Sequence, residues 1–198
     1  GDFVMANIKP FCSVRPNESL AREIAALPYD VYNREEAKQV VEKNPKSFLK
    51  IDRAETQFDD DFDMYSEEVY QKAHDTLAEM IDDGEFVKDE KPCFYVYELI
   101  MSQTGIVGCA SVDDYLNNVI MKHENTREDK ELDRIHHVDT CNAQTGPIFL
   151  TYRANEKINH IVTDKKQEKA LYDFVAEDGV SHRVWRIDAV EEVEKIAE

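Results

Sequence analysis

Hydrophobic residues follow a helical spacing in some segments of this chain and form short strand-like clusters in others, which predicts a mixture of helices and strands. The most regular stretch carries Tyr65, Val69, Ala73 and Leu77 at intervals of four residues, and Gly84 follows it. This interval places the side chains on one face of a helix, and glycine commonly ends helices. The pattern therefore predicts a long amphipathic helix that ends at Gly84.

A second helix is predicted over residues 34–43 by its end signals. Asn33 and Glu36 have the spacing of a capping box at the start of a helix. Pro45 disfavours helical geometry at the residue before it, so the helix is expected to end near Asn44. Apolar periodicity predicts three more helices, over residues 20–26, over residues 164–175 and from Val190 onward.

Strand-forming residues cluster in the middle and at the end of the chain. Residues 94–101 are rich in aromatic and β-branched side chains, and residues 106–110 follow after a short polar segment. This arrangement is typical of a β-hairpin. Similar composition predicts strands over residues 8–14, 148–152 and 182–187. The predicted class is α/β (mixed α+β), a mixed sheet with at least one antiparallel hairpin, flanked by helices.

The composition favours one compact domain over residues 1–198. The hydrophobic fraction of 42% is enough to fill a core at this length. Glycine and proline number six each, no segment has low complexity, and no internal repeat is present. No linker is therefore expected to divide the chain.

Charge and cysteine usage limit the class of protein. The formal net charge of −18 disfavours binding to nucleic acids and anionic membranes, because both attract clustered Lys and Arg. The four cysteines form no C-x-x-C pair, so neither a disulfide framework nor a zinc knuckle is expected. With no apolar run or basic leader of the kind that targets a chain to membranes, we expect a cytoplasmic protein.

No metal site and no cofactor are predicted. The aspartate-rich segment of residues 59–63 lacks the glycine and the glutamate that complete a calcium loop. His123 and Glu124 begin like a zinc-protease motif, but Arg127 stands where the second histidine is required. His136 and His137 are adjacent and would point to different faces of a helix, so a pair of surface histidines is expected.

The segment of residues 122–134 is the main candidate for an anion site. Thr126 and Asp129 have the spacing of a helix cap, and the basic residues that follow share one face of that helix. Free N–H groups at a helix start favour phosphate or carboxylate. The expected anion-binding residues are Lys122, Thr126, Arg127, Lys130 and Arg134. The alternative is a set of surface ion pairs with the acidic residues of the same helix.

Catalytic roles follow only by extension of this site. If a reaction occurs, His123 or Glu124 is the candidate general base, and the neighbouring cations would stabilise phosphate charge. Further candidate site residues are Tyr29 and Asp30, in a proline turn, and Arg53, after an apolar run. The alternative function is a noncatalytic regulatory or scaffolding module whose acidic surface docks a basic partner. Whether the chain is an enzyme, and its oligomeric state, are left open.

Six short motifs together resemble one family. They are Lys9-Pro10-Phe11, Pro28-Tyr29-Asp30-Val31, Asn44-Pro45-Lys46-Ser47-Phe48-Leu49, Tyr95-Val96-Tyr97-Glu98, Lys122-His123-Glu124-Asn125-Thr126 and Gly146-Pro147-Ile148-Phe149-Leu150. In this order they resemble the domain-of-unknown-function family DUF1015, often labelled a sporulation-partition regulator. The resemblance implies distant likeness to partition-protein and sulfiredoxin-like domains, which include nucleotide-binding proteins and free-serine kinases. It therefore implies phosphate or nucleotide binding and a link to serine metabolism.

One departure from the family pattern affects this expectation. Members of the family are usually about twice as long, and their second half carries an aspartate-glycine-histidine-histidine-arginine motif. In this chain, His182-Arg183 follows Val180-Ser181 instead. The resemblance therefore implies that the chain corresponds to the N-terminal half of a longer architecture.

Overall fold

The computed structural model describes residues 5–100 and 103–198 and divides the chain into two compact units. Unit 1 comprises Gly1–Glu18, Lys88–Asn125 and Thr151–Glu198, and unit 2 comprises Ser19–Val87 and Thr126–Leu150. The chain passes between the units four times, and no glycine or proline occupies the residues at these four boundaries. The composition therefore gave no sign of two units, and we expected a single one. That both belong to one domain stays a prediction.

Unit 1 contains an antiparallel sheet in which the strand order is β5-β4-β8-β7. These strands are β4 (Phe94–Leu99), β5 (Gln103–Val107), β7 (Tyr172–Val175) and β8 (Ser181–Ile187). Val96 of β4 lies opposite Ile106 of β5 and Trp185 of β8. The predicted hairpin and the predicted strand over residues 182–187 are therefore confirmed. The expected polar turn falls partly on residues 101–102, which lie outside the described residues.

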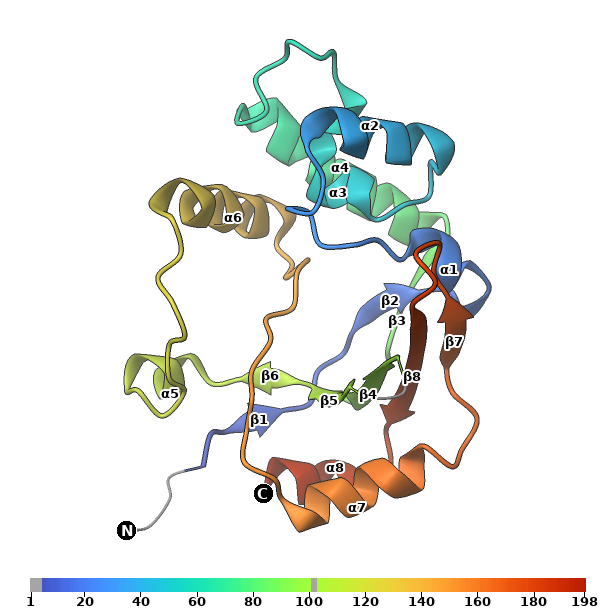
Figure 1. Ribbon diagram of the computed structural model, residues 1–198, viewed down its shortest axis with the longest axis vertical. Helices are drawn as coiled ribbons and strands as arrows, with labels where there is room; N and C mark the ends of the chain where they lie inside the picture. The colour runs from blue at the N-terminus through green and yellow to red at the C-terminus, as the bar shows by residue number, and fades with distance from the viewer. Residues whose placement is uncertain (1–4, 101–102) are drawn as a thin grey trace. The chain divides into compact units, whose positions relative to one another are not determined.

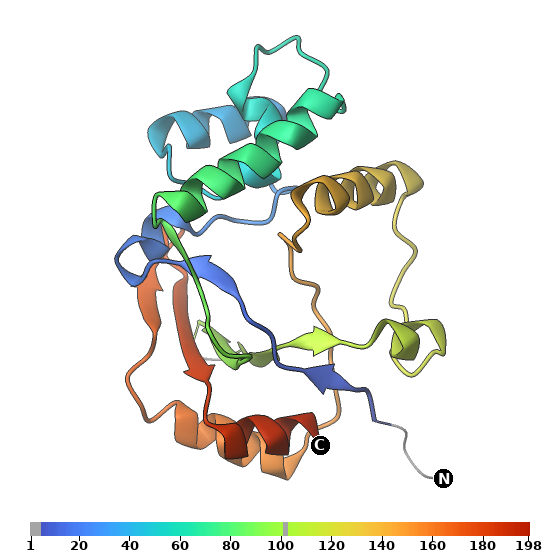
Figure 2. The same ribbon diagram turned by 180° about the vertical axis from the view of Figure 1, so that it is seen from behind.

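Two helices cover one face of this sheet, as Figures 1 and 2 show from opposite sides. They are α7 (Glu156–Lys165) and α8 (Val190–Ala197). Ile161 and Ile196 from these helices pack with the sheet residues Phe94, Val96, Trp185 and Ile187. Unit 1 also contains the paired strands β1 (Ile8–Lys9) and β6 (Cys109–Ala110), strand β2 (Val14–Pro16) and helix α5 (Val112–Leu116).

Gly108 is a close-packing position between β5 and β6. A Cβ atom at Gly108 would lie 2.7 Å from the Phe94 ring, which is fully buried, and 3.2 Å from the Lys9 carbonyl oxygen. Gly105 is the natural control, because a Cβ there meets nothing within 4 Å. We expect Gly108→Ala to lower the free energy of unfolding by about 1–3 kcal/mol through overpacking. Urea denaturation checks this, and equal losses in Gly108→Ala and Gly105→Ala would contradict it.

Unit 2 is built mainly from helices. They are α1 (Ala21–Ile24), α2 (Arg34–Lys43), α3 (Leu49–Asp52), α4 (Glu67–Asp82) and α6 (Glu128–Cys141), with 3-10 turns η1 (Glu18–Leu20) and η2 (Ala54–Gln57); strand β3 (Phe86–Lys88) lies where the chain leaves the unit. Helix α4 packs against α3 and α6 (Figure 2). The shared core contains Ile24, Ile51, Val69, Ala73, Met80 and Cys141.

The end signals of two helices are confirmed. The Asn33 side chain accepts from the Glu36 backbone N–H, and the Glu36 side chain accepts from the Asn33 N–H, so the capping box of α2 is complete. Val69 and Ala73 are buried on α4 as the periodicity predicted. Gly84 follows α4 with a φ of +73°, a left-handed conformation that glycine adopts at little cost.

Two predicted elements are wrong. Residues 148–152 form no strand, and Ile148 and Phe149 are 78% and 74% exposed. Residues 164–175 form no continuous helix, because α7 ends at Lys165 and β7 begins at Tyr172. A segment with strand propensity forms a strand only where a neighbouring strand offers free hydrogen-bonding groups. The spacing of apolar residues alone does not show where a helix ends and a strand begins.

The remaining differences are of length. The predicted strand over residues 8–14 is replaced by the short strands β1 and β2, and the predicted helix over residues 20–26 by η1 and α1. The α+β class is confirmed. None of the helices in the described part of the chain combines the length and the apolar character that a membrane crossing requires.

Candidate functional site

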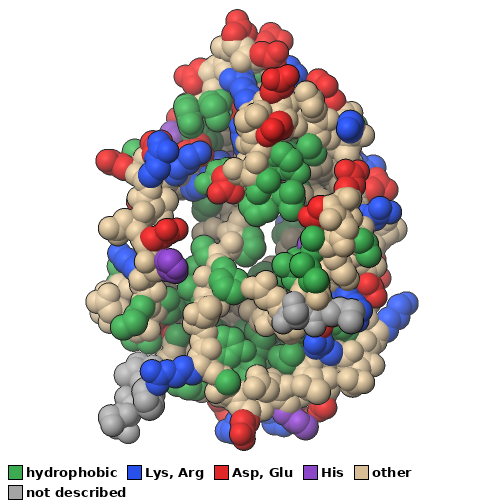
Figure 3. All heavy atoms as spheres, viewed as in Figure 1, with side chains coloured by type: hydrophobic (Ala, Val, Ile, Leu, Met, Phe, Trp, Pro, Cys, Tyr) green, Lys and Arg blue, Asp and Glu red, His purple; other side chains and the backbone are tan. Residues whose placement is uncertain are grey.

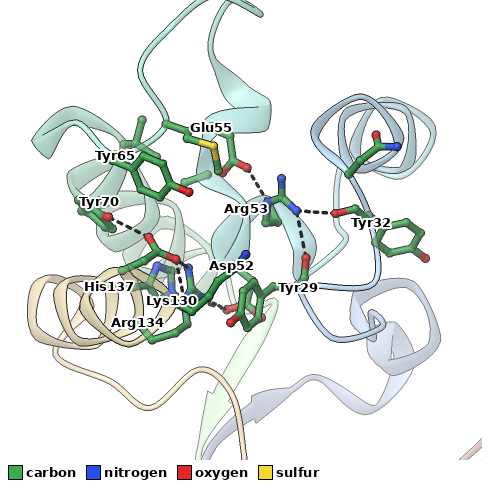
Figure 4. Close-up of a pocket in the computed structure, with 15 residues that line it drawn as sticks. Tyr29, Tyr32, Asp52, Arg53, Glu55, Tyr65, Tyr70, Lys130, Arg134 and His137 are labelled. Atoms are coloured by element: carbon green, nitrogen blue, oxygen red, sulfur yellow. Dashed lines mark hydrogen bonds and ion pairs between the residues drawn. The ribbon is translucent and has the colours of Figure 1, made fainter. Parts of the chain in front are cut away.

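A pocket of about 220 Å³ lies within unit 2. Figure 4 shows α6 on one side and, on the others, the turn before α2, the junction of α3 with η2, and the start of α4. Basic, acidic and phenolic side chains dominate its wall. The polar and charged lining residues are Tyr29, Tyr32, Asn33, Asp52, Arg53, Glu55, Tyr65, Tyr70, Lys130, Asp133, Arg134 and His137.

Helix α6 contributes Lys130, Arg134 and His137 to the pocket because residues three and four apart share a helix face. The Arg134 guanidinium carbon lies 4.1 Å from the centroid of the Tyr29 ring, and the Lys130 ammonium nitrogen lies 6.0 Å from the same centroid. Both distances allow attraction between a cation and an aromatic ring. Two of the cations predicted from the sequence therefore meet Tyr29, a further candidate, at one pocket.

The start of α6 differs from the prediction. The helix begins at Glu128 with Arg127 at the N-cap position, and no side chain caps it, so the predicted cap by Thr126 is wrong. Arg127 instead donates to Asp129 at 2.7 Å, and its side chain is 77% exposed. Acidic residues fill the first turn of α6, which offsets the attraction of its free N–H groups for an anion. Arg127 does not line the pocket, and Thr126 lines a second, more open hollow that shares Tyr29, Lys130 and Arg134 with the pocket.

Lys122, His123 and Glu124 belong to unit 1, where all three are exposed. The Lys122 ammonium nitrogen lies 4.8 Å from the centroid of the Tyr115 ring. A single anion site that joins these residues to α6 stays a prediction, as does the role of His123 or Glu124 as a base. Asp30 is exposed and does not line the pocket.

Arg53 holds the turn that presents Tyr29. The residue is 9% exposed, and its guanidinium donates to the Tyr29 carbonyl at 3.1 Å, to the Tyr32 carbonyl at 2.7 Å and to Glu55 at 2.5 Å. All of these acceptors lie within unit 2. Arg53 therefore fixes the backbone on which the Tyr29 ring is placed, and its own charge is already compensated.

The sequence reading missed the interior contact of His137. His137 is buried at 3% exposure, so the expectation of two surface histidines is wrong for this residue, although His136 is half exposed. The His137 Nε2 atom lies 3.6 Å from Asp52 Oδ1 and 3.9 Å from Cys141 Sγ. The four-residue interval between His137 and Cys141 places both residues on one face of a helix, and this was the signal in the sequence for their contact. The interval gives no information about the contact with Asp52, which is distant in the chain.

These three residues do not form a nucleophilic triad. Burial lowers the pKa of His137 to about 4 and raises the pKa of Cys141 to about 11. At neutral pH the imidazole is therefore uncharged and the thiol keeps its proton, whereas a reactive cysteine needs a thiolate. Asp52 and Cys141 also approach the same ring nitrogen, so no relay runs through the imidazole.

The phenols of the pocket are hydrogen-bond donors at neutral pH. Burial raises the pKa of Tyr29, and burial followed by the hydrogen bond to Asp133 raises the pKa of Tyr70. Tyr70 donates to Asp133 at 2.8 Å. In the part of the chain that the structure describes, no hydrogen bond engages the hydroxyls of Tyr29 and Tyr65. The pocket therefore offers hydrogen-bond donors and cations to a ligand. Among the residues that the structure describes, no three His, Cys, Asp or Glu side chains are placed to hold a metal ion.

A family model described as "Protein of unknown function (DUF1015)" matches residues 8–198. The family resemblance drawn from six short motifs is therefore confirmed, and the match covers nearly the whole chain. That the chain corresponds to the N-terminal half of a longer architecture stays a prediction. No curated protein and no solved structure matches the chain. The chain belongs to the DUF1015 family of proteins of unknown function.

Proposed function

We propose that unit 2 binds a small ligand with a phosphate or carboxylate group in the pocket beside α6. The observation that carries this proposal is the placement of Lys130 and Arg134 next to Tyr29 in a strongly acidic protein. Lys130 forms no ion pair with any described residue, so its charge is available to a ligand. Charge-assisted hydrogen bonds from such groups are the strong ones in anion recognition.

The enclosed part of the site has room for a small ligand. Its volume of about 220 Å³ is below the roughly 300–1,000 Å³ of pockets that enclose drug-sized molecules, and a second, more open hollow of about 520 Å³ also has Tyr29, Lys130 and Arg134 in its wall. The links to nucleotides and to serine metabolism come from the family resemblance and remain part of this proposal. The proposal concerns binding alone, and no reaction is assigned.

Replacing Lys130 with methionine tests the proposal. The change keeps an unbranched side chain only one atom shorter and removes its charge, so affinity for the ligand should fall about 10–100-fold. Arg127→Ala is the control, because Arg127 is an exposed cation at the start of the same helix but outside the pocket. The measurement is the melting temperature of the full chain with phosphate, serine, phosphoserine, ADP and ATP, because a ligand of the folded state raises it.

The expected result is a shift that Lys130→Met removes and Arg127→Ala preserves. Loss of the shift in Arg127→Ala alone would place the site at the start of α6, as the sequence pattern predicts. A shift that survives both substitutions, or no shift with any compound, would overturn the proposal.

The second candidate function is the docking of a basic partner, and one surface favours it. Asp59, Asp60, Asp61 and Asp63 are all exposed in the loop before α4. Acidic side chains gather over this loop at the top of Figure 3. Lys38 forms an ion pair with Asp60, and no cation in the described part of the chain pairs with the other three. Binding of an oligolysine peptide that weakens with salt and is lost when these four residues are changed to asparagine would support this alternative.

A further inference from the structure

Among the charges that line the pocket, one cation and one carboxylate lie outside the two close ion pairs. Six of the lining residues carry a formal charge, and the two shortest ion pairs account for four of them, while Asp52 comes no closer than 4.0 Å to a guanidinium nitrogen of Arg134. The pairs are Arg53–Glu55, at 2.5 Å, and Arg134–Asp133, at 2.9 Å. Lys130 and Asp52 remain, and both face the same pocket (Figure 4).

Asp52 holds a buried acceptor without a donor. The Asp52 Oδ1 atom is buried and accepts no hydrogen bond from the described residues, although the Thr145 hydroxyl donates to the carboxylate. The nearest cationic nitrogen belongs to Arg134 at 4.0 Å, and His137 Nε2 lies at 3.6 Å. Both distances exceed those of a hydrogen bond. A buried carboxylate oxygen with no donor is unusual in a native protein and calls for a ligand, a water or an ion.

We infer that the pocket takes a small zwitterion, whose acidic group meets Lys130 and Arg134 and whose ammonium group donates to Asp52. This inference rests on the proposed function and specifies its ligand. A simple anion would bring a second negative charge towards Asp52, whereas an ammonium group supplies both the missing donor and the opposite charge. The Asp52 side chain is only 12% exposed, so this contact is weakly screened by water.

Matched pairs of ligands test the ammonium contact. The pairs are L-alanine with propionate and phosphoethanolamine with ethyl phosphate, and each pair differs in the amine alone. By isothermal titration calorimetry of the full chain at pH 7, we expect the amine-bearing member to bind at least about tenfold more tightly. Lys130→Met should weaken both members of each pair and leave their ratio unchanged.

The Asp52→Asn variant assigns the contact to one residue. It preserves the shape of the side chain and removes the charge, so the ratio within each pair should fall to about one. Asp75→Asn is the matched control, because Asp75 is half exposed on α4 and lies outside the pocket lining. The control should preserve the ratio, and melting curves of both variants check that they fold.

The outcomes separate this inference from the proposed function. Equal binding of both members by the wild-type protein overturns the zwitterion and leaves the anion pocket standing. A preference that persists in Asp52→Asn overturns the role of Asp52. If neither these four compounds nor inorganic phosphate bind, both the inference and the proposed function are overturned.

Discussion

Replacing Arg53 with methionine is expected to lower the free energy of unfolding by about 3–5 kcal/mol. Arg53 and Glu55 are both buried, with side chains 10% and 5% exposed, and they lie 2.5 Å apart. Without the guanidinium, Glu55 becomes a buried carboxylate without a counter-ion, and the carbonyls of Tyr29 and Tyr32 lose a donor. Urea denaturation at pH 7 measures the loss.

A double substitution separates the charge of Glu55 from the carbonyl contacts. Arg53→Met combined with Glu55→Gln removes both charges, and we expect it to recover part of the lost stability because no buried charge remains unpaired. The exposed ion pair of Lys38 with Asp60 provides the comparison, since Lys38→Met should leave the free energy of unfolding almost unchanged. A loss for Arg53→Met as small as that for Lys38→Met would show that the buried pair does not stabilise unit 2.

The elements that the sequence predicted well carry local signals. The capping box of Asn33 with Glu36 and the stripe of Val69 and Ala73 involve residues within one or two helical turns, so their physics is visible in a short window. Residues 148–152 have the composition of a strand but not its structure. Pairing with another strand depends on distant residues, which no local pattern contains.

The candidate pocket shows the same division between local and distant information. Lys130 and Arg134 were found from their spacing on one helix, and Tyr29 and Arg53 as separate candidates. The sequence could not show that these four line one pocket, because Tyr29 and Arg53 precede the two residues of α6 by at least 77 positions in the chain. Asp52 and His137 were missed for a further reason. Their importance comes from burial and from their mutual distance of 3.6 Å, and neither quantity is encoded in residue type.

His137 is expected to make the protein less stable as the pH falls. Burial lowers its pKa from about 6.5 in the unfolded chain to about 4 in the native state. Between these values the unfolded state binds more protons, so the stability that His137 contributes is complete above pH 6.5 and is lost as the pH falls to 4. The difference of about 2.5 pKa units corresponds to about 3 kcal/mol.

Asp52 acts in the opposite direction, so the comparison must isolate the imidazole. Burial raises the pKa of Asp52, so the native state keeps this proton to a higher pH and becomes more stable as acid is added. At each pH, urea denaturation gives the free energy of unfolding of the wild type and of His137→Gln. Because both proteins contain Asp52, the difference between these two free energies largely cancels its contribution. The difference in unfolding free energy should decrease by about 3 kcal/mol from pH 7 to pH 4, with His136→Gln as the control for an exposed histidine on the same helix. Parallel curves for the wild type and His137→Gln would mean that the imidazole takes up its proton equally well in the folded and unfolded chains.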